Sequence, residues 1–60
     1  MILLQIIQYP RHCSISSHQF HLDGICLDII NGIALVESAN GSVTAFNLTE
    51  NYSIKFKDRR

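Results

Sequence analysis

ICLDIINGIALVESANGSVTAFNL, residues 25–48, is the stretch that decides the fold. It consists of short apolar runs separated by two Asn-Gly pairs, Asn31-Gly32 and Asn40-Gly41. Asn and Gly both tolerate the positive φ of a type I′ turn, so an Asn-Gly pair between β-prone runs is the strongest local signal for a hairpin. The stretch therefore predicts a three-strand antiparallel meander with strands at Ile25–Ile30, Ile33–Ser38 and Ser42–Leu48.

Neither face of these runs is cleanly polar. In the first run, simple alternation puts one set of side chains on one face and a second set on the other: Ile25, Leu27 and Ile29 against Cys26, Asp28 and Ile30. Strands that are apolar on both faces are usually covered on both sides. We therefore expect a second layer or a second subunit against the meander.

The chain before the meander is less regular. Met1–Tyr9 is apolar on both faces when extended and predicts a strand that Pro10 ends, because proline donates no hydrogen bond to a ladder. Arg11–Ser17 has the polar composition of a loop, and His18–Leu22 suggests a short edge strand. Asp23-Gly24 is a third dipeptide of the hairpin type.

The C-terminal run Tyr52–Lys57 has the cleanest alternation in the chain. It predicts a strand with Tyr52, Ile54 and Phe56 facing inward and Ser53, Lys55 and Lys57 facing outward. Lysines on an outer strand discourage pairing with another sheet, so this strand is expected at an edge.

These elements together predict an all-β protein, a small antiparallel meander or barrel of SH3 or Sm size with five to six short strands. Its 60 residues suffice for a single domain. We place a small β domain at residues 1–57 and a basic C-terminal tail at residues 58–60.

The charge is balanced overall and unevenly distributed. Residues 1–54 carry one base against four acids, a balance of −3, and residues 55–60 carry four bases against one acid, a balance of +3. MILLQIIQYP lacks the basic start and cleavage site of a signal peptide, and no run is long enough to span a bilayer. These features predict a soluble cytoplasmic protein that does not enter a membrane.

A domain of this size buries only about 60% of the surface that its unfolded chain exposes, and it often gains stability by association. The sequence is 47% hydrophobic, and its N-terminal run has more apolar surface than one small core can cover. We therefore expect a homo-oligomer or a complex with a protein partner. The predicted contact residues are Ile2, Leu3, Leu4, Ile6, Ile7 and Tyr9.

Five residues have side chains that commonly bind zinc: His12, Cys13, His18, His21 and Cys26. Their spacing contains no paired Cys-x-x-Cys clamp, and neighbours three apart on a strand point to opposite faces, so we predict no metal site and no cofactor. Cys13 lies beside Arg11 and His12, which would lower a thiol pKa, but nothing in the sequence supplies an oxyanion hole. We therefore predict that the protein is not an enzyme.

The basic residues at the C-terminus suggest an alternative function, the binding of nucleic acid. Lys55, Lys57, Arg59 and Arg60 surround Phe56, and a basic stripe with an aromatic ring can grip a phosphate backbone and stack a base. In addition, GICLDIINGIALVESA, residues 24–39, resembles the Gly…Asp…Asn pattern of the Sm-like RNA-binding barrels. The resemblance covers about a quarter of the chain and implies a strongly bent barrel with functional residues at Asp28 and Asn31. The family's later Arg-Gly motif is replaced by Asn47-Leu48.

Two functions follow from these observations, ahead of a third, a metal-stabilised module through the His and Cys residues, which their spacing disfavours. The first is a small non-catalytic interaction protein that binds and modulates a protein partner, which fits the size, the apolar surplus and the lack of a catalytic set. The second is a small-barrel nucleic-acid-binding protein that uses the basic C-terminal strand.

Overall fold

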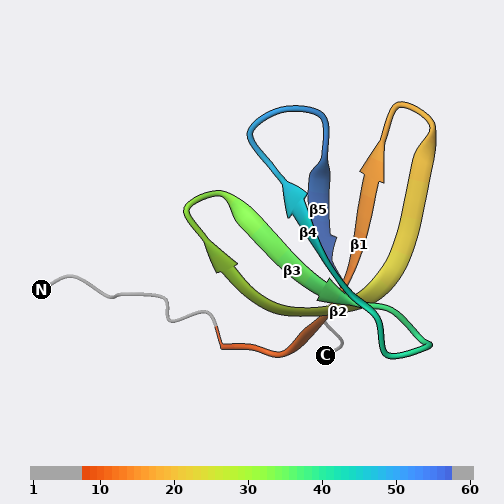
Figure 1. Ribbon diagram of the computed structural model, residues 1–60, viewed down its shortest axis with the longest axis vertical. Coiled ribbons are helices and arrows are strands. Elements are labelled where there is room, and N and C mark those ends of the chain that lie inside the picture. The colour runs from red at the N-terminus through yellow and green to blue at the C-terminus, as the bar shows by residue number, and fades with distance from the viewer. Residues whose placement is uncertain (1–7, 58–60) are drawn as a thin grey trace, which may run out of the picture.

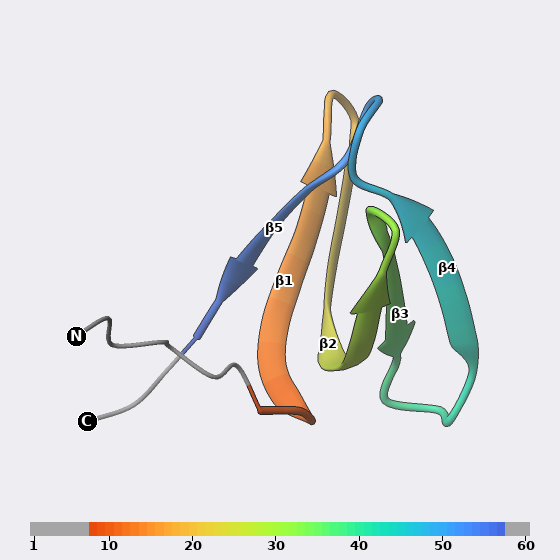
Figure 2. The same cartoon turned by 90° about the vertical axis from the view of Figure 1, so that its left-hand side faces the viewer.

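The computed structural model describes residues 8–57, which form one antiparallel sheet of five strands (Figure 1). The strands are β1 (Arg11–Ser17), β2 (Phe20–Ile30), β3 (Ile33–Glu37), β4 (Val43–Asn47) and β5 (Ser53–Phe56). Their order in the sheet is β4-β3-β2-β1-β5, so the first four strands form a meander and the last pairs with the first. Figure 2 shows β4 and β5 on opposite sides of the sheet. The prediction of a small all-β meander or barrel is confirmed.

β2 joins the two halves of the sheet. Its first part pairs with β1, from Phe20 opposite Ser17 to Cys26 opposite Arg11. Its second part pairs with β3, from Ile25 opposite Glu37 to Ile30 opposite Ile33. The long strand curves as it passes from one partner to the other (Figure 1). The sheet therefore has a first half of β5, β1 and the start of β2, and a second half of the end of β2, β3 and β4.

Gly24 lies where this change of partner begins. A Cβ atom at this position would stand 2.6 Å from the Glu37 carbonyl oxygen and 2.9 Å from Val36 Cγ1. Both distances are shorter than a carbon atom allows, so only glycine lets β2 come this close to the end of β3. The prediction that Asp23-Gly24 forms a hairpin turn was therefore wrong, because both residues lie inside β2.

The prediction of a loop at Arg11–Ser17 was also wrong. Arg11–Ser17, expected to be a loop, is β1, and the turn before β2 is at His18 and Gln19. Serine is common in turns because its hydroxyl competes for backbone groups. Here Cys13 and Ile15 are fully buried, and pairing on both sides satisfies the backbone, so tertiary contacts outweigh the local preference.

The two Asn-Gly pairs make different turns. Asn31 and Gly32 both have positive φ (53° and 77°), as a type I′ turn requires. At the second pair only Gly41 has a positive φ, 90°, and its N–H donates to the Ser38 carbonyl at 2.9 Å. This pattern is that of a three-residue loop with a bulge at glycine. The predicted meander is confirmed, and the prediction of a type I′ turn holds only at Asn31-Gly32.

A β-bulge in β2 overturns the simple alternation of its side chains. The register with β3 shifts between Cys26 and Asp28, so Leu27 is an extra residue. Before the bulge Cys26 lies opposite Val36 on the core side, and after it Ile29 lies opposite Ala34 on the same side. Cys26 and Ile29 therefore share the inner face, whereas the alternation had put them on opposite faces.

The core lies on the inner face of the curled sheet. Its buried members come from four strands and are Cys13, Ile15, Cys26, Ala34, Val36 and Phe46. The inward set predicted for the last strand is confirmed, since Tyr52, Ile54 and Phe56 pack against this core. The rings of Phe46 and Tyr52 are 5.1 Å apart between centroids, so the curl brings the chain just before β5 against β4.

Candidate functional site

The outer face of the second half of the sheet is largely apolar. The registers place in one row Ile25, Glu37 and Val43, in the next Asp28, Leu35 and Ala45, and in the last Ile30, Ile33 and Asn47. We call the apolar members of these rows the apolar outer face; they are Ile25, Ile30, Ile33, Leu35, Val43 and Ala45.

Two of these side chains are strongly exposed. Ile30 retains 52% and Val43 53% of its accessible surface, and the remaining large ones are half-buried. Most exposed apolar residues on a soluble protein occur singly, whereas a contiguous set points to a contact surface. No second layer covers this face within residues 8–57.

The outer face of the first half is polar. It consists of His12, Ser14, Ser16, His21, Asp23, Ser53 and Lys55, together with Lys57 just after β5. Lys57 Nζ lies 2.6 Å from Asp23 Oδ1, and His21 Nε2 lies 3.3 Å from the same oxygen. The hydrogen bond from Lys57 lowers the pKa of Asp23 below its ordinary value of 3.8, and the charges of Lys57 and His21 add to the effect.

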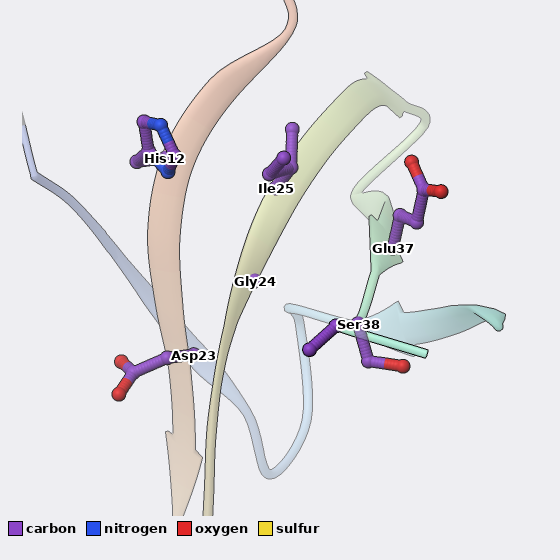
Figure 3. A pocket seen from close by; sticks show the side chains of 7 residues that line it. His12, Asp23, Gly24, Ile25, Glu37 and Ser38 are labelled. Atoms are coloured by element: carbon purple, nitrogen blue, oxygen red, sulfur yellow. The ribbon is translucent and has the colours of Figure 1, made fainter. Parts of the chain in front are cut away.

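A shallow groove of about 260 Å³ separates these two surfaces on the outer side (Figure 3). Along β2 it is lined by Asp23, Gly24 and Ile25, and its walls come from β1, β2 and the end of β3. Figure 3 shows His12 and Glu37 on either side of Ile25, with the carboxylates of Asp23 and Glu37 pointing away from each other. These titratable groups do not converge on one point, so the groove offers a recess for a side chain rather than an acid–base pair.

Asp28, which the Sm-like resemblance implied as functional, has a local structural role. Its Oδ1 accepts a hydrogen bond of 2.8 Å from the backbone N–H of Ile29, next to the bulge. Beyond Cys26, β2 is no longer paired with β1 on that side. The carboxylate thus satisfies a backbone group that the sheet leaves unpaired. Asn31, the other implied residue, supplies the positive φ of the turn.

Cys13 is not the exposed, activated thiol that its cationic neighbours suggested. It is fully buried in β1, and burial raises the pKa of its thiol above the ordinary value of 9.0. Burial also raises the pKa of Cys26, which packs in the same core. Arg11 lies with its guanidinium 4.0 Å from the centre of the Phe56 ring. Thiolate chemistry at neutral pH is therefore unfavourable at both cysteines.

The five possible zinc ligands are not brought together. Cys13 and Cys26 face the core, His12 and His21 lie at outer-face positions, and His18 is in the exposed turn. Among residues 8–57 no group of three or more His, Cys, Asp or Glu side chains is arranged to hold a metal ion.

The predicted N-terminal contact surface falls mostly outside the described residues. Ile2, Leu3, Leu4, Ile6 and Ile7 lie there, so their role in a partner or oligomer contact stays a prediction. Tyr9 is half-buried against the core, with its ring centroid 6.3 Å from that of Phe56. Desolvation raises the pKa of Tyr9 above its ordinary value of 10.0, and the nearby Cys26 and Asp28 add to the shift.

The basic residues proposed for nucleic acid are only partly described. Lys55 is exposed on the outer face and Lys57 is paired with Asp23, while Arg59 and Arg60 lie outside the described range. Phe56 faces inward between Tyr9 and Arg11, so it is not available as a stacking platform beside the lysines.

Comparisons with protein families, with curated proteins and with solved structures find no match to this chain. The fold of residues 8–57 is that of a small all-β protein built on one curled five-stranded antiparallel sheet. The described residues include no helix with the length and apolar character needed to cross a membrane.

Proposed function

We propose that this is a non-catalytic interaction protein that binds another protein through the apolar outer face and modulates it by occupying its surface. The observation that carries the proposal is the exposure of Ile30 and Val43 on a face whose other large residues are also apolar. Binding a complementary surface removes such side chains from water, and that gain is the main driving force of most protein association.

The charged residues beside the apolar side chains indicate the charge of the partner's binding surface. Asp28 and Glu37 lie in the same rows as Leu35 and Val43, and Glu37 also lines the groove. A partner segment with apolar side chains flanked by lysine or arginine would complement this arrangement, because charge complementarity selects partners and speeds association. A side chain of that segment would fit the groove beside Ile25 and Glu37.

The experiment is affinity capture from a host lysate with three forms of the protein: wild type, Ile30→Glu and Ser53→Glu. Both substituted residues are exposed, so both variants are expected to fold, and circular dichroism checks that they do. We expect a protein captured by wild type and by Ser53→Glu to be lost with Ile30→Glu. Equal capture by all three forms would show that the apolar outer face is not the binding surface.

The nucleic-acid alternative is separated by the same experiment. Capture through nucleic acid would disappear on nuclease treatment and weaken steeply with salt, because phosphate contacts release counterions. Capture through the apolar outer face would survive both treatments. The inward position of Phe56 favours the protein partner.

A further inference from the structure

The free edge of β4 differs from the edge at β5, the other edge strand of the described sheet. β4 pairs with β3 on one side, and its other side has no partner among residues 8–57. Residues 42–48, SVTAFNL, contain no charge and no proline. Charged residues and proline normally protect an exposed edge, because its unpaired N–H and C=O groups are a template for another strand.

The hydrogen-bond pattern tells which residues present those groups. At one end of the β3–β4 ladder the Ser38 N–H donates to the Ser42 carbonyl (2.8 Å), and at the other the Leu48 N–H donates to the Gly32 carbonyl (2.8 Å). Bonded and non-bonded pairs alternate along an antiparallel ladder. The backbone groups of Thr44 and Phe46 therefore point to β3, and those of Val43, Ala45 and Asn47 point to the free edge.

We propose that two copies of the chain pair antiparallel along β4, about a two-fold axis at Ala45. In this register Ala45 exchanges both backbone hydrogen bonds with its own copy, and Val43 exchanges both with Asn47 of the other chain. Every outward backbone group of β4 is then satisfied. The two-fold axis passes through a contact of the same residues from both chains, as an isologous dimer requires.

The side chains permit this register. The residue on the axis is alanine, which is small and exposed, so the backbones can approach without a clash. No charged side chain faces its own copy, whereas like charges directly opposite each other destabilise a strand pair. The same pairing along β5 would bring Lys55 and Lys57 of both copies together, so a second copy is expected at β4 and not at β5.

The dimer would also enlarge the apolar outer face. Val43 and Ala45 belong to that face and lie on the pairing strand. Pairing makes the two sheets continuous and sets the two apolar outer faces next to each other across the axis. The inference does not require the proposed partner, and its test uses the purified protein alone, so the two can fail independently.

Cysteine cross-linking tests the register. In a bonded antiparallel pair the Cα atoms are about 5.5 Å apart, within the range of a disulfide. Ala45→Cys should therefore form an intermolecular disulfide rapidly under a mild oxidant such as diamide. In the matched control Val43→Cys, the two thiols are about four residues apart along the pair, or about 13 Å, and should link far more slowly. The native cysteines are fully buried and do not interfere. Equal rates for the two variants, or no link in Ala45→Cys, would contradict the register.

Sedimentation of the purified protein tests the dimer itself. We expect wild type and Ser53→Lys to sediment as dimers, and Ala45→Lys to sediment as a monomer with an unchanged circular dichroism spectrum. If Ala45→Lys is unfolded, Ala45→Pro replaces it, since that change removes an outward N–H and leaves the β3 ladder intact. A monomeric wild type would show that the protein does not dimerise. A dimer that survives in Ala45→Lys and is lost in Ile7→Glu would show that the N-terminal segment makes the contact. Either result would overturn the proposal.

Discussion

The two halves of the sheet share one core and differ in what they present to solvent. On the inner face, Ile15 of the first half and Val36 of the second are both fully buried. On the outer face, the first half carries an ion pair between Lys57 and Asp23, and the second half carries exposed Ile30 and Val43. The edges follow the same division, with lysines on β5 and no charge on β4.

The contrast between the two outer faces distinguishes residues that stabilise the fold from residues that are available to bind a partner. Residues on the inner face are explained by packing, because each fills space against the others. The polar outer face of the first half is explained by its exposure to water. Within residues 8–57, neither packing nor solvation explains the exposed apolar side chains of the apolar outer face or the uncharged free edge of β4.

The largest expected effect comes from breaking the contact between the halves at Phe46. Its ring lies on β4 and meets Phe20 at 5.7 Å and Tyr52 at 5.1 Å between centroids, both of which belong to the other side of the curl. Phe46→Ala should lower the free energy of unfolding by about 3–5 kcal/mol, since it removes a buried ring and leaves a cavity.

Urea denaturation measures that loss, and Phe20→Ala is the matched control. Phe20 is 41% exposed, so its removal should cost about 1 kcal/mol. If the two variants lose the same stability, the halves are not joined mainly through Phe46.

The next largest effect is expected where β2 comes close to the end of β3, at Gly24. Gly24→Ala would place a Cβ 2.6 Å from the Glu37 carbonyl oxygen, a backbone atom that cannot move without disturbing the β2–β3 ladder. We expect a loss of about 2–3 kcal/mol. Gly41→Ala meets no atom within 4 Å and strains only a φ of 90°, so it should cost about 1 kcal/mol. Thermal unfolding compares the two, and a smaller loss at Gly24 would contradict the close approach.

The two cysteines report whether solvent and reagents reach the shared core. Cys13 and Cys26 should react with Ellman's reagent only as fast as the protein unfolds, because both thiols are buried. Their pKa values are raised in the folded state, so unfolding releases protons above the ordinary thiol pKa of 9.0. Stability should therefore be constant with respect to these groups below pH 9.0 and fall as the pH rises beyond it. The variant Cys13→Ala/Cys26→Ala should lose that decline, and rapid reaction of the native thiols would show that the core is open.

The smallest effect is expected on the polar outer face. Lys57→Met should leave the stability at pH 7 within the error of a denaturation experiment, because exposed ion pairs contribute little. It should nevertheless raise the pKa of Asp23 back toward 3.8, which an NMR pH titration detects. The contribution of this lowered pKa to stability is present above pH 3.8 and is lost as the pH falls, so wild type and variant should also be equally stable in acid. An unchanged pKa would show that the ion pair does not form in solution.

Local chemistry alone made the second half of the sheet predictable. Asn31-Gly32 sets a tight turn, and the runs on either side have the β-branched residues that suit strands, so three strands and their antiparallel pairing were found correctly. The alternation in Tyr52–Lys57 likewise identified an edge strand with its inward face. The apolar character of both faces of the meander was also visible in the sequence.

The first half and the candidate site required the tertiary structure. Serines in Arg11–Ser17 and the dipeptide Asp23-Gly24 indicate loop and turn when only neighbours are considered, yet both lie in strands that pair with distant segments. The bulge at Leu27 shifts the face of every later residue in β2, and alternation cannot detect an inserted residue.

The sequence by itself determined the all-β class, the meander and the lysine-bearing last strand, because turn residues and alternation act over a few neighbouring positions. Only the tertiary structure decided that β5 pairs with β1, that Gly24 lies inside a continuous strand close to the end of β3, and that one edge of β4 has no partner among residues 8–57. These outcomes depend on contacts between residues far apart in the chain, where the closing of the core selects among pairings that local preference leaves equal.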